Sequence, residues 1–216
     1  MPVVALTGGV AAGKSTVSAV LEERGAVVLD ADVYAREAVS PGSPGLAAVM
    51  ERFGDSVMGA DGTLDRAALG ALVFGDTVAK ADLEAIIHPL VRRLSAEAIR
   101  EATTLQPETV LVYDIPLLAE ARDPGEFDVV VLVDAPSEQR QARLESERGF
   151  SAEEASARVL AQASDEQRRA IADVVLDASQ SVEVTQAAAH ELFDALTDAW
   201  PDRLAHLPRI FPFSAT

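Results

Sequence analysis

The chain has 216 residues, 49% of them apolar, which suits one compact domain with an insertion and excludes a wholly disordered chain. Asp and Glu outnumber Lys and Arg by 35 to 18, and the net charge of −17 excludes a general affinity for nucleic acid or anionic membranes. There is no cysteine, which excludes disulfides, thiolate catalysis and cysteine metal sites.

Two further absences narrow the class of protein. The three histidines are widely spaced, so no histidine metal cluster is expected. No segment approaches the roughly 18 apolar residues of a membrane span, and the first residues lack the basic region of a secretion signal. We therefore expect a soluble, cytoplasmic protein with no nucleic-acid or membrane partner, and the sequence does not indicate its oligomeric state.

The first thirty residues predict a β-α-β unit. An apolar run from Val3 to Leu6 is typical of a buried strand and ends in a glycine turn. A helical pattern follows from Lys14 to about Glu23, and Gly25 closes it. Ala26–Leu29 predicts a second strand. This order favours a parallel sheet.

The next segment, from about residue 31 to 106, shows helical patterns broken by glycine and proline clusters, without a strong strand pattern. We interpret residues 35–106 as a helical insertion, in which His88 and Pro89 mark a boundary between two helices. The core would comprise residues 1–34 and 107–200. It would contain three more strands, a charged helical stretch and a closing helix, predicted at Val110–Tyr113, Val129–Val133, Val174–Leu176, Ser137–Ala170 and Ser181–Trp200. Residues 201–216 predict an irregular tail.

One motif carries the chemistry. Gly8–Ser15 fits G-x-x-x-x-G-K-S/T and stands between a predicted strand and a predicted helix. Glycines let backbone N–H groups turn toward phosphate oxygens, and the helix N-terminus favours an anion. Lys14 would reach the β- and γ-phosphates of ATP, and the Ser15 hydroxyl would bind Mg²⁺. We expect the nucleotide to contact Gly9, Val10, Ala11, Ala12, Gly13, Lys14, Ser15 and Thr16.

Carboxylates follow two of the predicted strands. Asp32 is either a base that accepts a proton from an attacking hydroxyl or the N-cap of the next helix, and the residues favour neither. Asp30, before it, is better explained as structural. Asp114 ends the third strand, where a carboxylate holds Mg²⁺ directly or through water, although an aspartate also suits a turn. Asp134 ends the fourth strand and is better explained by the start of a helix.

Arginines cluster in the charged helical stretch and could neutralise charge on a transferred phosphoryl group. Interleaved glutamates favour a solvated salt-bridge surface for most of them, so we expect one or two to be functional. The candidates are Arg140, Arg143, Arg148, Arg158, Arg168 and Arg169.

Together, several segments resemble the dephospho-CoA kinase family. They extend over almost all of residues 3–177. The segments are L-T-G-G-V-A-A-G-K-S-T at Leu6–Thr16, L-D-A-D at Leu29–Asp32, I-I-H-P-L-V at Ile86–Val91, D-I-P-L-L-A-E at Asp114–Glu120, L-A-Q-A-S at Leu160–Ser164 and R-R-A-I-A-D at Arg168–Asp173. One departure is Ala178, where the family often has asparagine near the nucleotide base.

The resemblance implies a P-loop NTPase fold of three layers, with a parallel sheet of about five strands, a helical insertion that binds the CoA substrate, and a lid at about residues 138–168. It implies transfer of phosphate from ATP to the ribose 3′-hydroxyl of dephospho-CoA, the last step of CoA biosynthesis. Asp32 would be the general base, with Lys14 and Ser15 on ATP and Mg²⁺. Arg143 or Arg140 would be the lid arginine, and His88 and Arg66 would line the acceptor site.

Three other classes of protein also bind nucleotides through a glycine loop of this kind. A switch GTPase needs an N-K-x-D segment, which a chain without asparagine cannot contain. A non-catalytic ATP-binding protein is disfavoured by Lys14, Ser15, Asp32 and Asp114. Another small-molecule or nucleoside monophosphate kinase on the same core stays open on residue chemistry, because a fold does not fix its acceptor.

Overall fold

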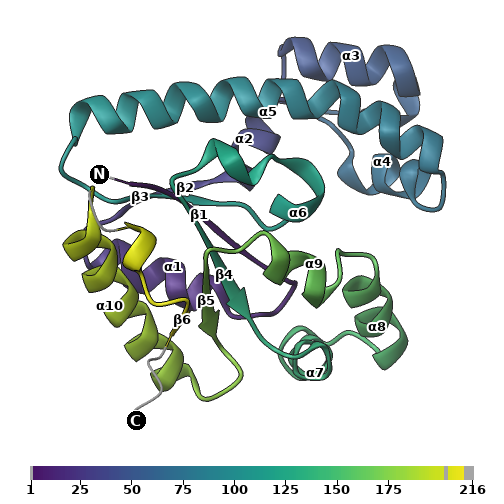
Figure 1. Cartoon of the computed structure of the whole chain (residues 1–216). Coiled ribbons are helices and arrows are strands. Elements are labelled where there is room, and N and C mark those ends of the chain that lie inside the picture. Colours follow the sequence, from purple (N-terminus) through teal and green to yellow (C-terminus); the bar gives the residue numbers. More distant parts are fainter. Residues whose placement is uncertain (1, 202–203, 212–216) are drawn as a thin grey trace. The chain divides into compact units, whose positions relative to one another are not determined.

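A computed structural model describes residues 2–201 and 204–211. Six strands form one sheet in the order β2-β3-β1-β4-β5-β6 (Figure 1). The pairs β1–β3, β1–β4, β4–β5 and β5–β6 are parallel. The strands are β1 Val3–Gly8, β2 Val27–Asp30, β3 Leu111–Asp114, β4 Val129–Asp134, β5 Val174–Asp177 and β6 Ile210–Phe211. The carboxyl ends of paired parallel strands meet at one edge, which is where such sheets bind ligands.

The chain divides into two compact units. The sheet unit consists of the described residues up to Leu29 and from Ala102 onward. Its helices are α1 Lys14–Glu23, α6 Leu118–Ala121, α7 Ser137–Arg148, α8 Ala152–Leu160, α9 Asp165–Ala170 and α10 Val182–Ala199, with 3₁₀ turns at Pro124–Glu126 and Leu204–His206.

The helical unit is Asp30–Glu101. It contains α2 Ala31–Glu37, α3 Pro44–Phe53, a 3₁₀ turn at Asp55–Val57, α4 Arg66–Val73 and most of α5 Thr77–Leu105. A separate small core of Val39, Val49, Val57 and Leu69 holds these helices together, with Ile86 and Ile87 of α5 packed against it.

Two helices cover one face of the sheet. α1 and α10 pack beside each other (Figure 1). Val17 and Leu21 of α1 and Leu192 of α10 are fully buried in one cluster with strand residues such as Leu6 and Val131. The regularly spaced apolar residues of α1 therefore face the sheet. This packing holds the start of α1 directly after the glycine loop.

His88 and Pro89 lie inside a helix, so the expected helix boundary at this point is wrong. α5 runs without interruption for 29 residues and contains Pro89. Proline removes one backbone N–H and one hydrogen bond from a helix. Ile86 and Ile87, which directly precede His88, pack on the small core, and this burial holds the helix together across the missing bond.

The described part of the expected irregular tail, residue 201 and residues 204–211, also differs from the expectation, while residues 202–203 and 212–216 lie outside the described residues. Ile210 and Phe211 form β6, which pairs in parallel with β5, and the Val175 N–H donates to the Arg209 carbonyl at 2.7 Å. Phe211 is fully buried in the main core. A strand of two residues has too few side chains to produce a periodic pattern, so it could not be predicted from the sequence.

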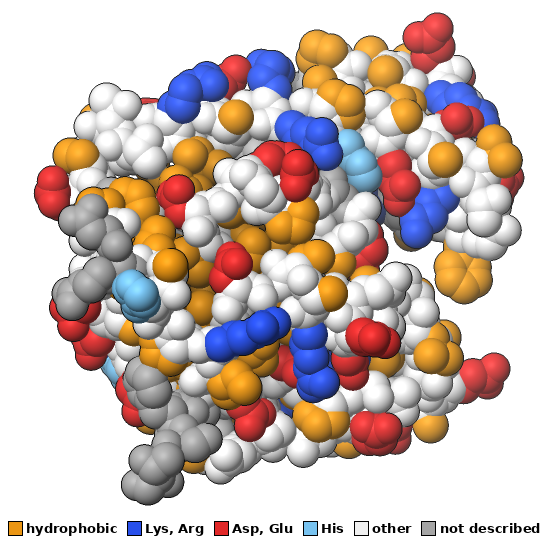
Figure 2. Space-filling model, in the orientation of Figure 1, with side chains coloured by type: hydrophobic (Ala, Val, Ile, Leu, Met, Phe, Trp, Pro, Cys, Tyr) orange, Lys and Arg blue, Asp and Glu red, His pale blue; other side chains and the backbone are white. Residues whose placement is uncertain are grey.

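Acidic side chains are spread over the face of the molecule seen in Figure 2 rather than gathered in one patch. In the described part of the chain, every helix is too short or too polar to cross a bilayer.

Phe211 offers a test of whether the tail contributes to the core. We expect Phe211→Ala to lower the free energy of unfolding by about 3–5 kcal/mol, because it leaves a cavity in the core. The neighbouring Ile210 is 59% exposed, so Ile210→Ala should cost less than about 1 kcal/mol. Urea unfolding of both variants measures the difference, and equal losses would contradict the burial of Phe211.

Candidate active site

The glycine loop joins β1 to α1 at the carboxyl edge of the sheet. A side chain at Gly8 is sterically excluded, because a Cβ there would lie 2.7 Å from the carbonyl oxygen of Val133 on β4. Gly13 has a φ of 103°, a value that favours glycine, and it is the N-cap of α1. Steric constraints thus explain why the motif has glycine at both of these positions. The loop leads directly into a helix N-terminus.

Lys14, Asp114 and Ser18 form a polar cluster beside the loop. The β1–β3 register pairs Leu6 with Asp114, which places this carboxylate next to the end of β1. Lys14 Nζ donates to Asp114 Oδ1, and Ser18 Oγ donates to Oδ2 at 3.0 Å. The ion pair is largely buried, with side-chain exposures of 18% and 11%. Lys14 is therefore held near the loop by a carboxylate.

The Arg143 guanidinium contacts backbone carbonyls of the loop. Its Nη1 donates to the carbonyl oxygens of Ala11 and Ala12, at 3.2 and 3.1 Å, and its Nη2 donates to the Ala178 carbonyl at 2.7 Å. Arg143 thus joins the loop to the residue that follows β5. With these carbonyls turned toward Arg143, the loop's shape is supported from the side of α7.

Arg140 and Arg168 pack against Gly9. A Cβ at Gly9 would lie 2.9 Å from Arg140 Cζ and 3.2 Å from Arg168 Nη2. Both side chains are buried, at 2% and 4% exposure, and both donate to one oxygen of Asp165. Arg140 Nε also donates to the Ala135 carbonyl at 3.1 Å. Two guanidinium groups therefore share one carboxylate against the loop backbone.

This arrangement concentrates positive charge. Burial, followed by repulsion from Arg168, lowers the pKa of Arg140 from its ordinary value, although arginine stays protonated in proteins. Its Nη1 is buried and meets no acceptor within the described residues. The acidic chain thus has buried guanidinium groups beside the loop, which supply the local positive charge that an anionic ligand needs.

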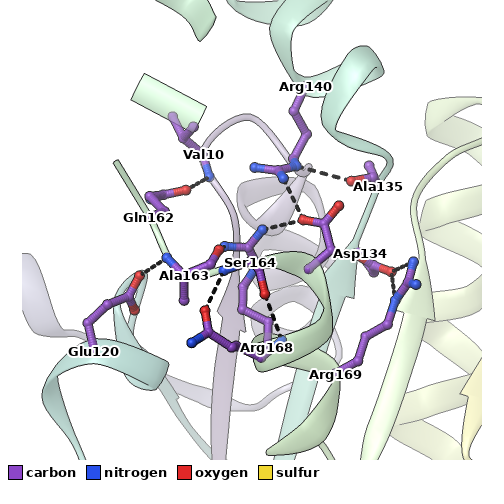
Figure 3. Close-up of polar contacts among 12 residues, drawn as sticks. Val10, Glu120, Asp134, Ala135, Arg140, Gln162, Ala163, Ser164, Arg168 and Arg169 are labelled. Carbon is purple, nitrogen blue, oxygen red and sulfur yellow. Dashed lines mark hydrogen bonds and ion pairs between the residues drawn. The ribbon is translucent and has the colours of Figure 1, made fainter. Parts of the chain in front are cut away.

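A turn at residues 161–164, the lid turn, connects α8 to α9 and contacts the loop (Figure 3). The Val10 N–H donates to Gln162 Oε1 at 2.8 Å, and the Ala163 N–H donates to Glu120 Oε1 at 2.7 Å. Arg168 Nη1 donates to the Ala163 carbonyl. The turn is thereby fixed to the loop, to α6 and to α9.

Apolar contacts join the same parts. Leu144 of α7 and Ala155 and Val159 of α8 form a small buried cluster. Val10 and Ala11 from the tip of the loop pack against it. The loop therefore rests on the α7–α8 pair through side chains as well as through hydrogen bonds.

A hollow of about 140 Å³ lies beside the loop, where the loop enters α1. It is lined by Gly13 and Thr16 of the loop, by Arg143, and by Ala178 and Gln180 after β5. Both backbone groups of Ala178 are bound, because its N–H donates to the Asp134 carbonyl and its carbonyl accepts from Arg143. Polar side chains also line the hollow, among them the exposed Gln180 and Glu147.

The other three candidates from the sequence lie in the helical unit. Asp32 is exposed in the first turn of α2, and the N-cap of that helix is Asp30, whose carboxylate accepts from the Asp32 N–H at 2.8 Å. Arg66 is exposed at the first residue of α4. His88 is half-buried and lines a shallow hollow on α5 with Pro89.

Sequence reasoning missed Gln162, Glu120 and Asp165 as site residues and did not single out Arg168. One signal could have found the lid turn. Ser151 with Glu154, and Ser164 with Gln167, form capping boxes that start α8 and α9, and the pattern is readable as S-x-x-E/Q. The contacts across more than 100 residues, such as Gln162 with Val10, had no such signal.

The parallel sheet, the glycine loop with its lysine and the arginines against the loop define a kinase of the P-loop class. The family model for dephospho-CoA kinase matches residues 2–183. The dephospho-CoA kinase of Frankia casuarinae is 48% identical over 94% of this chain and 83% of its own, and that of Streptomyces avermitilis is 47% identical over 95% and 96%. The chain belongs to the dephospho-CoA kinase family.

Solved structures agree on the fold. TT1252 from Thermus thermophilus is similar with a TM-score of 0.75 and 37% identity, over 90% of this chain and 96% of its own. Shikimate kinase from Acinetobacter baumannii reaches a TM-score of 0.51 at 15% identity, over 94% and 96%. The latter likeness concerns the fold alone.

The contact at Gly9 predicts a steric coupling. Gly9→Ala should lower the free energy of unfolding by about 1–3 kcal/mol, because the added methyl group collides with the Arg140 guanidinium. In an Arg140→Ala background the same substitution should cost less, since part of the collision is gone. Urea unfolding of the four proteins measures this coupling, and an equal cost in both backgrounds would argue against the packing described.

Proposed function

We propose that this protein transfers the γ-phosphoryl group of ATP to the ribose 3′-hydroxyl of dephospho-CoA, giving coenzyme A. The observation that carries the proposal is the positively charged glycine loop, with Lys14 and Arg140 against it, in a chain of the dephospho-CoA kinase family.

The phosphates of ATP would bind the loop from Gly9 to Thr16, through backbone N–H groups and Lys14. Lys14 would exchange its contact with Asp114 for one with phosphate oxygens. The base would occupy the hollow lined by Thr16, Arg143 and Gln180. Arg143 suits this place because a guanidinium plane stacks on aromatic rings.

The oxygen donors near the loop fit Mg²⁺. Mg²⁺ is usually held by one or two protein oxygens together with substrate phosphates. Among the described residues, no group of three acidic or histidine side chains could hold a metal. The Ser15 hydroxyl and the Asp114 carboxylate would hold the ion, because Asp114 Oδ1 loses its partner when Lys14 moves to the phosphates, while Ser18 keeps Oδ2 in place. A bound Mg²⁺ would neutralise charge on the phosphates.

Of the two lid arginines considered, Arg140 is the better candidate for the transferred group. The Arg143 donors contact three backbone carbonyls, which makes its role the support of the loop and the base. Arg140 brings an Nη1 without an acceptor to the side of Gly9. Preorganised donors of this kind stabilise the charge that spreads over a phosphoryl group in the transition state.

In the helical unit, Asp32 would act as the general base. The competing explanation, that Asp32 caps α2, is weakened because Asp30 fills that position. The oxygen of the 3′-hydroxyl would attack the γ-phosphorus, and Asp32 would accept the proton that this hydroxyl loses. The bond from the γ-phosphorus to the bridging oxygen breaks, and its electron pair stays with ADP. Arg66 and His88 would contact the acceptor.

The assignment is tested by ADP release from ATP and Mg²⁺ with dephospho-CoA, in parallel with AMP, CMP, gluconate and shikimate. We expect turnover with dephospho-CoA alone. Turnover with another of these acceptors, and none with dephospho-CoA, would leave a P-loop kinase and overturn the acceptor.

Asp32→Asn should retain ATP binding and lower kcat on the order of 10²-fold or more, because the general base is lost. Asp30→Asn is the matched control, since asparagine caps a helix as well as aspartate does, and it should leave kcat unchanged. Steady-state kinetics and ATP titration measure both variants. Near-normal kcat in Asp32→Asn would remove Asp32 from this role.

Lys14→Ala should weaken ATP binding and lower kcat, because the loop loses its phosphate-reaching cation. Titration calorimetry with ATP and turnover measurements follow the two effects separately. Unchanged values of both quantities would contradict the proposed use of the loop.

A further inference from the structure

Arg168 is a buried arginine without a role in the proposed mechanism. It lies on α9, at 4% side-chain exposure, in the sheet unit that contains the loop. Its Nη2 would lie 3.2 Å from a Cβ at Gly9, so its guanidinium reaches the same stretch of loop backbone as Arg140. Figure 3 shows Arg140 and Arg168 extending toward each other from two different helices.

Its known contacts orient the Arg168 guanidinium without using up its donors. Two of its N–H groups donate, one to the Ala163 carbonyl and one to Asp165 Oδ1. An arginine carries five N–H donors in a planar fork. The lid turn and Asp165 therefore hold the plane of Arg168 in place, and the Nη2 edge faces Gly9.

The charge balance around Gly9 points to an anion. Arg140 and Arg168 share a single oxygen of Asp165. Asp134 also attracts Arg140, but its carboxylate pairs with Arg169, so three guanidinium groups meet two carboxylates there. Repulsion from Arg168 contributes to the lowered pKa of Arg140, whose Nη1 is buried without an acceptor among described residues. A buried charge that is incompletely compensated is costly. A phosphoryl group bound at the loop would compensate it.

We propose that Arg168 is a second catalytic guanidinium, which contacts the phosphoryl group during transfer together with Arg140. This inference rests on the proposed function for the reaction itself. As the acceptor oxygen bonds to the γ-phosphorus and the bond to ADP breaks, negative charge spreads over the three outer oxygens of the group. Two planar guanidinium groups stabilise that charge from the Gly9 side of the loop.

A purely structural role would confine Arg168 to holding the Ala163 carbonyl and Asp165. The two roles differ for Arg168→Lys. Lysine retains the charge and the reach toward these two oxygens, but it presents a point charge instead of a fork. A structural role predicts near-normal kcat for this variant, whereas the catalytic role predicts a loss.

The experiment compares steady-state kinetics of the wild type, Arg168→Lys and Arg168→Ala, with Arg169→Ala as the neighbouring control. Arg169 is 56% exposed at its side chain and pairs with Asp134. We expect Arg168→Ala to lower kcat on the order of 10²-fold with a much smaller change in the KM for ATP. Arg168→Lys should also lose kcat, and Arg169→Ala should not.

Guanidinium ion provides the second measurement. Added at millimolar concentration to Arg168→Ala, it should restore part of the lost kcat by entering the vacated space, without an effect on the Arg169→Ala control. Wild-type kcat in Arg168→Lys, or a lost kcat in Arg168→Ala that guanidinium does not raise, would overturn the proposal. Circular dichroism and thermal unfolding check that the variants fold.

The outcome separates the two proposals. Wild-type protein is measured first with dephospho-CoA, and absence of ADP release there would contradict the proposed function. The Arg168 comparison then uses whichever acceptor drives ADP release, because the role of Arg168 concerns the group that leaves ATP and not the acceptor.

Discussion

The packing of two guanidinium groups against the Cα of Gly9 constrains the rest of the nucleotide-binding unit. A Cβ at this position would enter the space of the Arg140 guanidinium and touch Arg168, so the loop can accept these neighbours only without a side chain. Their mutual repulsion must in turn be reduced, and Asp165 does this by accepting from both. The relative positions of the loop, α7 and α9 therefore depend on one contact, which requires both a close steric fit and a balance of charge.

The lid turn shows how that contact is kept in place. Gln162 fixes the turn to the Val10 N–H, and Glu120 fixes it to α6. Apolar packing of Val10 against the α7–α8 cluster also holds the loop in place, without involving charged groups. Because the anchors come from distant parts of the chain, the arginines on α7 and α9 are held in position by the tertiary structure of the sheet unit. Such preorganisation is where electrostatic catalysis gains its advantage over water.

The acidic composition and the basic site are compatible for a physical reason. A net charge of −17 sets the long-range field of the protein and disfavours polyanions. Over the few ångströms around the loop, buried arginines dominate, since charges are screened least in the interior. Asp114 on Lys14 and Asp165 on the two arginines hold these cations close to the loop. A small anion that reaches the loop meets the cations, whereas a large polyanion meets the acidic surface.

The sequence by itself determined the parts of this protein that depend on local pattern. It predicted a strand, a glycine loop and a helix that starts at Lys14, and the structure confirms the helix at Lys14–Glu23. It also predicted the buried strands, because fully buried parallel strands are continuous apolar runs. The sequence also indicated the family, because the segments that resemble it occur in a characteristic order along the chain.

The tertiary structure alone decided which groups meet. The sequence left Arg140 and Arg143 equivalent, and only folding separates them, with one at Gly9 and the other on three backbone carbonyls. It expected a helix boundary at Pro89, where burial of the neighbouring isoleucines carries α5 through. It gave no sign of β6, because two residues show no periodicity. These outcomes depend on packing between residues far apart in the chain, and local propensity contains no information about such contacts.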